Sequence, residues 1–280
     1  MDTLIDKVIP IQDASSEVFY GNIRDAMKRD LPWQYQLPGW GQPKNDAVAL
    51  MGGGPSLAVE IKKINFSGAV VACGSVHDYL VEQAIPFDYA IFCDPSPVVL
   101  QYIKKPQKTT TYLVATCCDP SVFEHLKDYT VYRWHCFNDD IEAFKAIDAN
   151  FSAIGGGCTV GLRALTMMMM LGYRDFHMFG FDSCLKSGDS YAYPLADGDV
   201  VSDKVYKIKL DPKSDKYYDC LGYHMAQVDN FKDYTAKYYD YFRCWFHGGG
   251  LMAEMYDLVD MQIRAGKLRS LYNKRTEANG

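Results

Sequence analysis

The sequence lacks the features that mark a membrane protein or a secreted one. Its longest apolar run, residues 164–171, is far shorter than the ~20 residues that a membrane-spanning helix needs. Near the start, Asp2 and Asp6 stand where a signal peptide needs basic residues. The nine cysteines are odd in number and scattered, which is typical of reduced thiols. We therefore expect a cytoplasmic protein with no membrane span.

Positive charge and metal-binding motifs are also scarce. The chain has 29 Lys and Arg against 35 Asp and Glu, a net charge of −6, which disfavours nucleic acid as the main partner. It has no Cys-x-x-Cys pair to hold zinc, and we predict no metal site. Hydrophobic residues, by contrast, make up 48% of the 280 residues and aromatic ones 14%. This composition predicts a folded protein with a substantial core.

Short apolar runs alternate with helical stretches from residue 46 onward. We predict strands at 47–51, 69–73, 89–93, 111–115, 131–134, 176–181 and 243–246. We predict helices at 76–83, 121–127, 141–147, 160–171 and 227–241. Nearly continuous apolar strands separated by helices are typical of strands buried on both faces. The pattern predicts an α/β fold with a mostly parallel sheet and helices on both of its faces.

The sequence divides into three parts. Residues 1–45 are predicted to form an N-terminal helical cap, and residues 46–265 the main domain. Within that domain, residues 183–219 are rich in Asp, Lys, Ser, Gly and Tyr and interrupt the strand–helix pattern. A long excursion of this kind is usually functional, and we predict an inserted lid. Residues 266–280 are predicted to form a C-terminal tail, and its basic and polar residues 267–280 are interpreted as a fraying helix end.

The strongest local motif is Gly-Gly-Gly-Pro-Ser-Leu, directly after the first predicted strand. Gly52, Gly53 and Gly54 allow a ligand to approach the backbone closely. Pro55 suits the first position of a helix, whose N-terminus attracts anions. The motif has neither the lysine of a P-loop nor the third glycine of the dinucleotide-binding fingerprint. It predicts a phosphate site, and the alternative is a tight turn without a ligand.

A second glycine cluster precedes the long apolar helix predicted at 160–171. It contains Gly156 and Gly157 and ends at Thr159, which is suited to cap that helix or to bind a ligand oxygen. Because both glycine clusters lead into helices, we expect the two turns to face one crevice. The run of four methionines, residues 167–170, is interpreted as core filling.

Polar residues at the predicted strand ends are candidates for chemistry. Asp94 and Asp182 each follow a buried strand, where a carboxylate can hold a ribose hydroxyl, Mg²⁺ or a substrate hydroxyl. The alternative for Asp94 is a helix cap. Among six histidines, His224 adjoins the predicted lid and is our candidate general base. The alternative for His224 is a hydrogen-bonded structural histidine.

The order of these motifs resembles a known family. The blocks GGGPSL, FDYAIFCD, GGGCTVGLRALTMMMMLGYRDFHMFGFD and FHGGGLM follow one another over residues 46–252. They resemble the MptE-like domain family, which groups archaeal-type 6-hydroxymethylpterin diphosphokinases with motility-associated flagellin glycosyltransferases and is similar to bacterial family-42 sialyltransferases. The resemblance implies a modified Rossmann-like domain that binds a nucleotide-activated donor. The donor contacts that it implies are Gly52, Gly53, Gly54, Ser56, Asp94, Gly156, Gly157 and Thr159.

Three hypotheses for the function follow. The first is a sialyltransferase-like glycosyltransferase, which passes a sugar from a nucleotide sugar to a hydroxyl of a glycan, a protein or a small molecule. Backbone N–H groups of Gly53, Gly54 and Thr159 would stabilise the leaving phosphate, and His224 or Asp182 would deprotonate the acceptor. The second is a diphosphokinase that uses ATP with Mg²⁺ held at the acidic strand end. The third is a non-catalytic nucleotide-binding module, and in each case a homo-oligomer remains open.

Overall fold

The structure is a computed structural model that describes residues 15–137, 140–196 and 204–278. Eight strands form one sheet in which every pair of neighbours is parallel. In sheet order they are β10 (Arg243–His247), β7 (Asp175–Phe179), β1 (Val48–Met51), β2 (Ala69–Cys73), β3 (Tyr89–Phe92), β4 (Thr111–Ala115), β5 (Thr130–Cys136) and β6 (Ala153–Ile154). The predicted α/β fold with a parallel sheet is confirmed.

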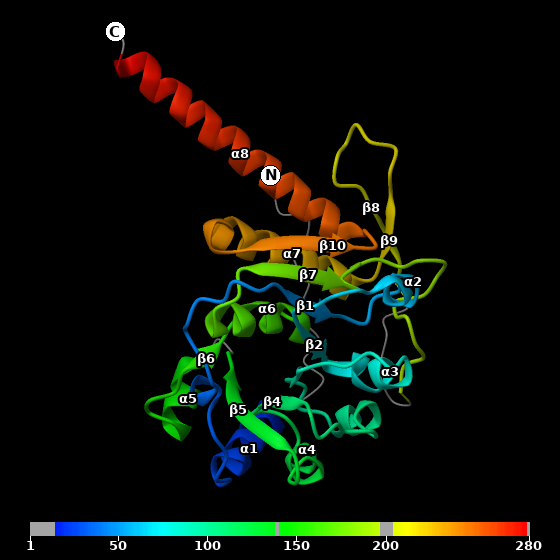
Figure 1. Ribbon diagram of the computed structural model, residues 1–280, viewed down its shortest axis with the longest axis vertical. Coiled ribbons are helices and arrows are strands. Elements are labelled where there is room, and N and C mark those ends of the chain that lie inside the picture. Colours follow the sequence, from blue (N-terminus) through cyan, green and yellow to red (C-terminus); the bar gives the residue numbers. More distant parts are fainter. Residues whose placement is uncertain (1–14, 138–139, 197–203, 279–280) are drawn as a thin grey trace.

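Helices connect the strands and cover the sheet (Figure 1). They are α1 (Ser16–Met27), α2 (Leu57–Glu60), α3 (His77–Glu82), α4 (Pro120–His125), α5 (Ile141–Ile147), α6 (Val160–Leu171), α7 (Gly222–Tyr238) and α8 (Leu251–Ala278). Helix α8 packs against α7 and then projects away from the rest of the molecule (Figure 1). The prediction of a helix at 227–241 was late by a turn, since α7 begins at Gly222.

The direction of the chain across the sheet reverses beside β1. The strands from β1 to β6 follow one another in one direction, and β7 and β10 are then added on the other side of β1. Met51 at the end of β1 is paired with Phe179 at the end of β7, so the turns after these strands lie side by side. Open α/β sheets bind ligands at the carboxyl ends of strands where the order reverses. The first glycine turn therefore occupies the expected position of a binding crevice.

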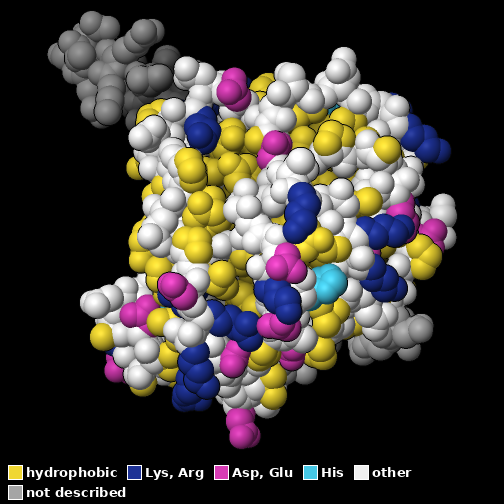
Figure 2. Space-filling model, turned by 60° about the horizontal axis from the view of Figure 1, so that its bottom comes forward, with side chains coloured by type: hydrophobic (Ala, Val, Ile, Leu, Met, Phe, Trp, Pro, Cys, Tyr) yellow, Lys and Arg dark blue, Asp and Glu magenta, His cyan; other side chains and the backbone are white. Residues whose placement is uncertain are grey.

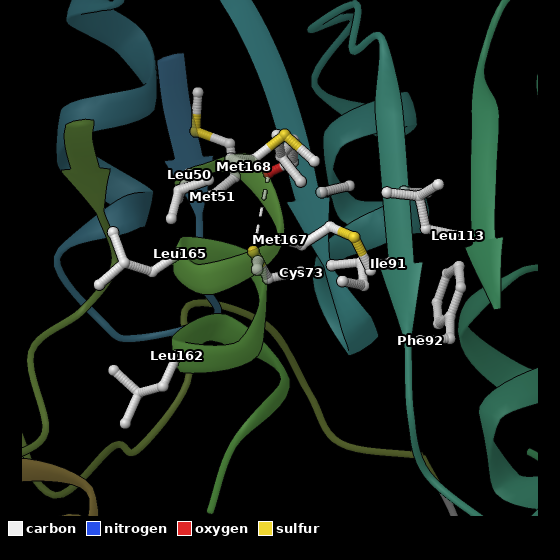
Figure 3. Packing of buried hydrophobic residues seen from close by; sticks show 14 of the residues in the cluster. Leu50, Met51, Cys73, Ile91, Phe92, Leu113, Leu162, Leu165, Met167 and Met168 are labelled. Atoms are coloured by element: carbon white, nitrogen blue, oxygen red, sulfur yellow. Dashed lines mark hydrogen bonds between the residues drawn. The ribbon is translucent and has the colours of Figure 1, made fainter. Parts of the chain in front are cut away.

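Helix α6 lies on one face of the sheet, where it contacts β1, β2 and β3. Thr159 caps the helix by accepting a hydrogen bond from the Leu162 N–H at 3.4 Å, and Gly172 ends it with a φ of 115°. Met167 and Met168 are fully buried among side chains of the central strands, as Figure 3 shows. Met170, by contrast, is 39% exposed. Met167 and Met168 therefore stabilise the core, at roughly 1.5–3 kcal/mol for each buried side chain.

The N-terminal segment packs at the far end of the sheet, where α1 contacts α4 and α5. The Asn22 side chain donates a hydrogen bond to the Cys117 carbonyl at 3.0 Å, just beyond β4. The predicted lid insertion contains an antiparallel hairpin of β8 (Tyr206–Ile208) and β9 (Tyr218–Cys220). Residues 1–14 of the predicted cap, 197–203 of the insertion and 279–280 of the tail lie outside the described residues.

Charged side chains of both signs are interspersed on the face that Figure 2 shows. Local ion pairs at helix ends include Lys127 with Glu124 at 2.7 Å and Arg29 with Asp25 at 2.9 Å. Hydrophobic side chains gather mainly on the left and upper parts of the same face (Figure 2). Among the described helices, none combines the length and the apolar character needed to cross a membrane.

Candidate functional site

A cavity of about 160 Å³ opens where the chain order reverses. The turn after β1, the start of α6, the segment after β7 and the start of α7 form its walls. The lining residues are Gly52, Gly53, Gly54, Cys73, Ser75, Thr159, Val160, Gly161, Gly180, Phe181, Ser183, Ser190, Tyr191, Tyr223, His224, Gln227 and Met252. The structure thus brings Gly53, Thr159 and His224 together, and no Lys, Arg, Asp or Glu is among these described lining residues.

Most backbone N–H groups of the first glycine turn already have acceptors within the protein. The donor–acceptor pairs are Gly52 with Phe179 (2.8 Å), Gly54 with Gly180 (2.8 Å), Ser56 with Asp182 (3.0 Å) and Leu57 with Gly54 (3.0 Å). Pro55 has no N–H to donate. Within the described part of the chain, the Gly53 N–H has no acceptor. Gly53 therefore has a free N–H donor for a ligand. The Gly54 N–H, which we expected to bind the ligand, donates to the Gly180 carbonyl instead.

The predicted lid passes directly over Gly53. The Gly53 carbonyl accepts a hydrogen bond from the Ala192 N–H at 2.9 Å. A Cβ atom at position 53 would meet the Tyr193 hydroxyl and would lie 2.9 Å from Cδ1 of Tyr191. The Tyr193 hydroxyl also lies 2.8 Å from Oγ of Ser75, which follows β2. The glycine is required because only hydrogen fits between the turn and these rings.

The first turn of α6 supplies the second set of free donors. The first N–H groups of a helix have no acceptor within it, and those of Val160 and Gly161 belong to residues that line the cavity. Together with the helix dipole they favour an anion at this point. Helix α2 contains only four residues. A helix does follow the first glycine turn as predicted, but the Ser56 and Leu57 N–H groups at its start already donate within the protein, so the free helix donors at the cavity are those of α6.

His224 lies in the first turn of α7, is 4% exposed and lines the cavity. Its Nδ1 accepts a hydrogen bond from the Leu221 N–H at 3.2 Å, so the neutral ring carries its proton on Nε2. Burial lowers the pKa of His224 to about 4, because the charged form loses its hydration. At neutral pH the ring is thus an uncharged hydrogen-bond donor through Nε2. The contacts indicate a donor where we predicted a base.

Asp182 is fully buried below the glycine turn and does not line the cavity. Its Oδ2 accepts from both the N–H and the hydroxyl of Ser56, at 3.0 Å and 2.8 Å. Its Oδ1 lies 2.9 Å from Nζ of Lys186. These contacts give Asp182 a positioning role for the turn. They offer no support for the prediction that it deprotonates an acceptor.

Comparison with known proteins adds the family. Residues 36–188 match the family model described as 6-hydroxymethylpterin diphosphokinase MptE-like. The chain belongs to the MptE-like family. The matched range includes the first glycine turn, α6 and Asp182, whereas α7 with His224 lies beyond it. No curated protein matches the sequence.

The fold of this MptE-like chain is similar to that of a solved Maf glycosyltransferase from Magnetospirillum magneticum AMB-1. The TM-score is 0.59 at 15% sequence identity, and the similarity covers 88% of this chain and 42% of that one. The chain thus spans less than half the length of that protein. At this identity the likeness shows a shared fold.

Four of the predicted donor-binding residues lie outside the cavity of the MptE-like domain. Ser56 is buried against Asp182. Asp94 is exposed after β3, and its Oδ1 accepts a hydrogen bond from the Ser96 N–H at 2.8 Å. Gly156 and Gly157 line a separate hollow beside α7. Thr159 lines the cavity, so the second glycine turn reaches it only through its last residue and the start of α6.

Other residues of the cavity wall were not predicted from the sequence. Tyr223 and Gln227 lie with His224 on the first turns of α7, and Gln227 Oε1 accepts a hydrogen bond from the Ser183 hydroxyl at 2.9 Å. Nothing in the sequence indicated that α7 begins as early as Gly222, because glycine is an unusual first residue of a helix. Ser75 follows β2, and the rule that strand ends carry function would have found it.

Proposed function

We propose that this MptE-like chain is a transferase that binds a nucleotide sugar and passes the sugar to a hydroxyl acceptor. The observation that carries the proposal is the convergence of Gly53, the first turn of α6 and His224 on one cavity. Each of them presents N–H donors that lack protein acceptors among the described residues. A phosphate group is the anion that such donors fit, because its oxygens accept several hydrogen bonds at once.

The transfer step uses these donors at the leaving group. The acceptor oxygen forms a bond to the anomeric carbon of the sugar while the bond from that carbon to a phosphate oxygen breaks. The electron pair of the broken bond moves onto the phosphate oxygen, where the N–H groups of Gly53, Val160 and Gly161 stabilise it. His224 donates to the same phosphate from Nε2. The proton of the acceptor passes to the departing phosphate, because Nε2 of His224 already carries one.

The remaining cavity wall suits the uncharged parts of the donor. Tyr191 and Tyr223 present aromatic rings, and nucleobases stack on such rings regardless of their identity. Ser75, Ser190 and Gln227 add hydroxyl and amide groups that pair with sugar hydroxyls. Because hydrogen bonds are stronger in a water-poor site, neutral donors suffice to hold the phosphate.

The description of the family favours a second candidate, a diphosphokinase. For this candidate we predicted ATP as the donor and Mg²⁺ as the metal ion. Mg²⁺ is bound through carboxylates together with phosphate oxygens. The described cavity wall contains no Asp or Glu, Asp94 is exposed outside it, and the Asp182 carboxylate is held by Ser56 and Lys186. The residues present therefore do not fit a resident Mg²⁺ ion, and we derive no step through one.

A thermal-shift screen tests the proposal. The ligands are CMP-, UDP- and GDP-sugars, ATP and S-adenosylmethionine, each with Mg²⁺ and with EDTA. A ligand at 100 times its Kd stabilises the folded state by about 2.7 kcal/mol. We expect a nucleotide sugar to raise the Tm in EDTA as well as in Mg²⁺. A shift by ATP with Mg²⁺ alone would replace the glycosyltransferase with the diphosphokinase, and binding without sugar release or transfer would indicate a non-catalytic module.

A further inference from the structure

Ser183 lies in the segment after β7 and has a backbone conformation that serine rarely adopts. Its φ is 47°, in the left-handed region where the Cβ atom crowds the backbone. Ala84 and Ser187 are the other described non-glycine residues with a positive φ. Glycine adopts this conformation without steric cost, so a serine at position 183 indicates that its side chain has a role.

Contacts on both sides hold Ser183 in this conformation. The carbonyl of Asp182 accepts a hydrogen bond from the Leu251 N–H at 2.8 Å, and the carbonyl of Ser183 accepts one from the Cys220 thiol at 3.6 Å. Ser183 is only 6% exposed. Because the backbone is held by α8 on one side and by β9 on the other, the direction of the Ser183 side chain is set as well.

The Ser183 hydroxyl contacts a side chain of the cavity wall. It donates a hydrogen bond to Oε1 of Gln227 at 2.9 Å, and both residues line the cavity at the first glycine turn, which the proposed function makes the donor cavity. A glutamine amide has one acceptor and one NH2 donor group. Ser183 satisfies the acceptor, and among the described residues the Gln227 NH2 group has no acceptor. The NH2 group is therefore available to a ligand in the cavity.

The orientation of this amide matters because the proposed donor carries phosphate. The last torsion of a glutamine side chain is broad and roughly two-fold, so an unrestrained amide turns either end toward a ligand. Its oxygen would repel the oxygens of a phosphate, whereas its NH2 group donates to them. His224 lies three positions earlier in α7 and presents its Nε2–H to the same cavity. Bonded to Ser183, Gln227 adds a second neutral donor on the next turn of that helix.

We propose that Ser183 is a positioning residue for donor binding. Its hydroxyl holds the Gln227 amide so that the NH2 group donates a hydrogen bond to an oxygen of the nucleotide sugar, beside the phosphate that His224 contacts. The inference rests on the proposed glycosyltransferase function, which it deepens. It also gives the strained serine a role that glycine cannot fill, because glycine fits the backbone but has no hydroxyl.

Calorimetric titration of the full chain, with the CMP-, UDP- or GDP-sugar that raises the Tm most, tests this. Ser183→Gly relieves the backbone but removes the hydroxyl, and we expect the Kd to rise about tenfold. Its Tm should stay within about 4 °C of the wild type, because the relieved strain and the lost bond oppose each other. Ser187→Gly is the matched control, since Ser187 has a φ of 52°, is exposed and lies outside the cavity. It should keep the wild-type Kd.

A second variant tests the amide itself. Gln227→Glu keeps an oxygen for the Ser183 hydroxyl and replaces the NH2 group with another acceptor, so the Kd should rise about tenfold or more. Gln262→Glu makes the same change at an exposed position of α8 and should bind as the wild type does. In NMR spectra, the side-chain NH2 resonances that disappear in Gln227→Glu belong to Gln227. In the wild type they should move on titration and saturate with the calorimetric Kd.

The inference is overturned if Ser183→Gly or Gln227→Glu binds as the wild type does, if Ser187→Gly weakens binding as much as Ser183→Gly, or if the Gln227 resonances stay in place. Should Ser183→Gly fail to fold, Ser183→Ala takes its place in the titration. If a nucleotide sugar raises the Tm of the wild type while the variants bind it equally well, the positioning role alone is wrong. If no nucleotide sugar raises that Tm, the glycosyltransferase itself is refuted, and the positioning role with it.

Discussion

The carboxylate of Asp182 holds Ser56 twice, through its N–H at 3.0 Å and its hydroxyl at 2.8 Å. The backbone of Asp182 adds a further contact, because its carbonyl accepts a hydrogen bond from the Leu251 N–H at 2.8 Å. A single residue in the segment that follows β7, Asp182, therefore holds both the first glycine turn and the start of α8. The shape of the donor cavity depends on this junction.

Removing the charge of Asp182 should destabilise the fold. We expect Asp182→Asn to lower the free energy of unfolding by about 2 kcal/mol, because bonds to a charged acceptor are lost and Lys186 loses its partner. Ser56→Ala should cost about 1 kcal/mol. Because the two residues contact each other, the double variant should lose less than the sum of the two. Urea unfolding of the four proteins measures this, and strictly additive losses would contradict the account.

Neighbouring glycines of the first turn should respond differently to substitution. Gly53→Val displaces the tyrosines of the lid, and we expect the nucleotide-sugar thermal shift to disappear while the far-UV circular dichroism stays unchanged. Gly54→Ala should instead lower the Tm, because its Cβ would meet Asp182 and the Gly180 carbonyl, the latter at 2.6 Å. Gly155→Ala is the control, with nothing within 4 Å of the new Cβ. A shift that survives in Gly53→Val would place the donor elsewhere.

Much of the sheet could be predicted from the sequence, because its central strands are continuous apolar runs. The bounds of β2 and β4 agree with the prediction at every residue, as do those of α6, which has a capping Thr159 and a terminal Gly172. Strand β6 was missed because two residues carry no periodicity. Only the end of helix α8 was predicted, and its first part was missed because its polar composition masks its apolar face, of which Met255 and Val259 are buried.

From the sequence, candidate site residues could be found mainly by their position after a predicted strand. Gly53, Thr159 and His224 were selected and do line one cavity. Asp94 was selected by the same rule but follows β3, two strands away from β1, and strand order is not readable from the sequence. Hydrogen bonds between residues far apart in the sequence could not be predicted either. The pairing of Ser56 with Asp182, 126 positions apart, turned two predicted ligand contacts into a structural bond.

The stability of the protein should fall below neutral pH in part through His224. An unfolded histidine titrates near 6.5, whereas burial lowers the pKa of His224 to about 4. Above pH 6.5 the ring is neutral in both states. Between about pH 6.5 and about pH 4 the unfolded chain binds a proton that the folded one does not, so the free energy of unfolding falls with falling pH.

His224→Asn removes this group and should reduce that slope. It should not abolish the slope, because burial also lowers the pKa of His135, His177 and His247. Urea unfolding at a series of pH values between 4 and 7 measures both proteins. Equal slopes for the two would show that His224 is not held neutral by the fold.

The hydrogen bond between Tyr193 and Ser75 should hold the insertion over the cavity. Tyr193→Phe removes one hydroxyl while keeping the ring, and we expect about 1 kcal/mol less resistance to local opening. Limited proteolysis of residues 183–219 should then proceed about fivefold faster with little change in Tm. Ser75→Ala removes the other partner of this 2.8 Å contact and should have the same effect. Unchanged cleavage in both variants would show that the contact does not restrain the insertion.

The central claim is that the two glycine-bordered turns share one phosphate, and backbone amide NMR tests it most directly. The protein is titrated with the nucleotide sugar that gives the largest thermal shift. The account predicts that the amide resonances of Gly53, Val160 and Gly161 move together and saturate with a single Kd, while that of Gly155 stays in place. Resonances of Gly53 and of the α6 amides that remain still, or that saturate with different Kd values, would contradict it.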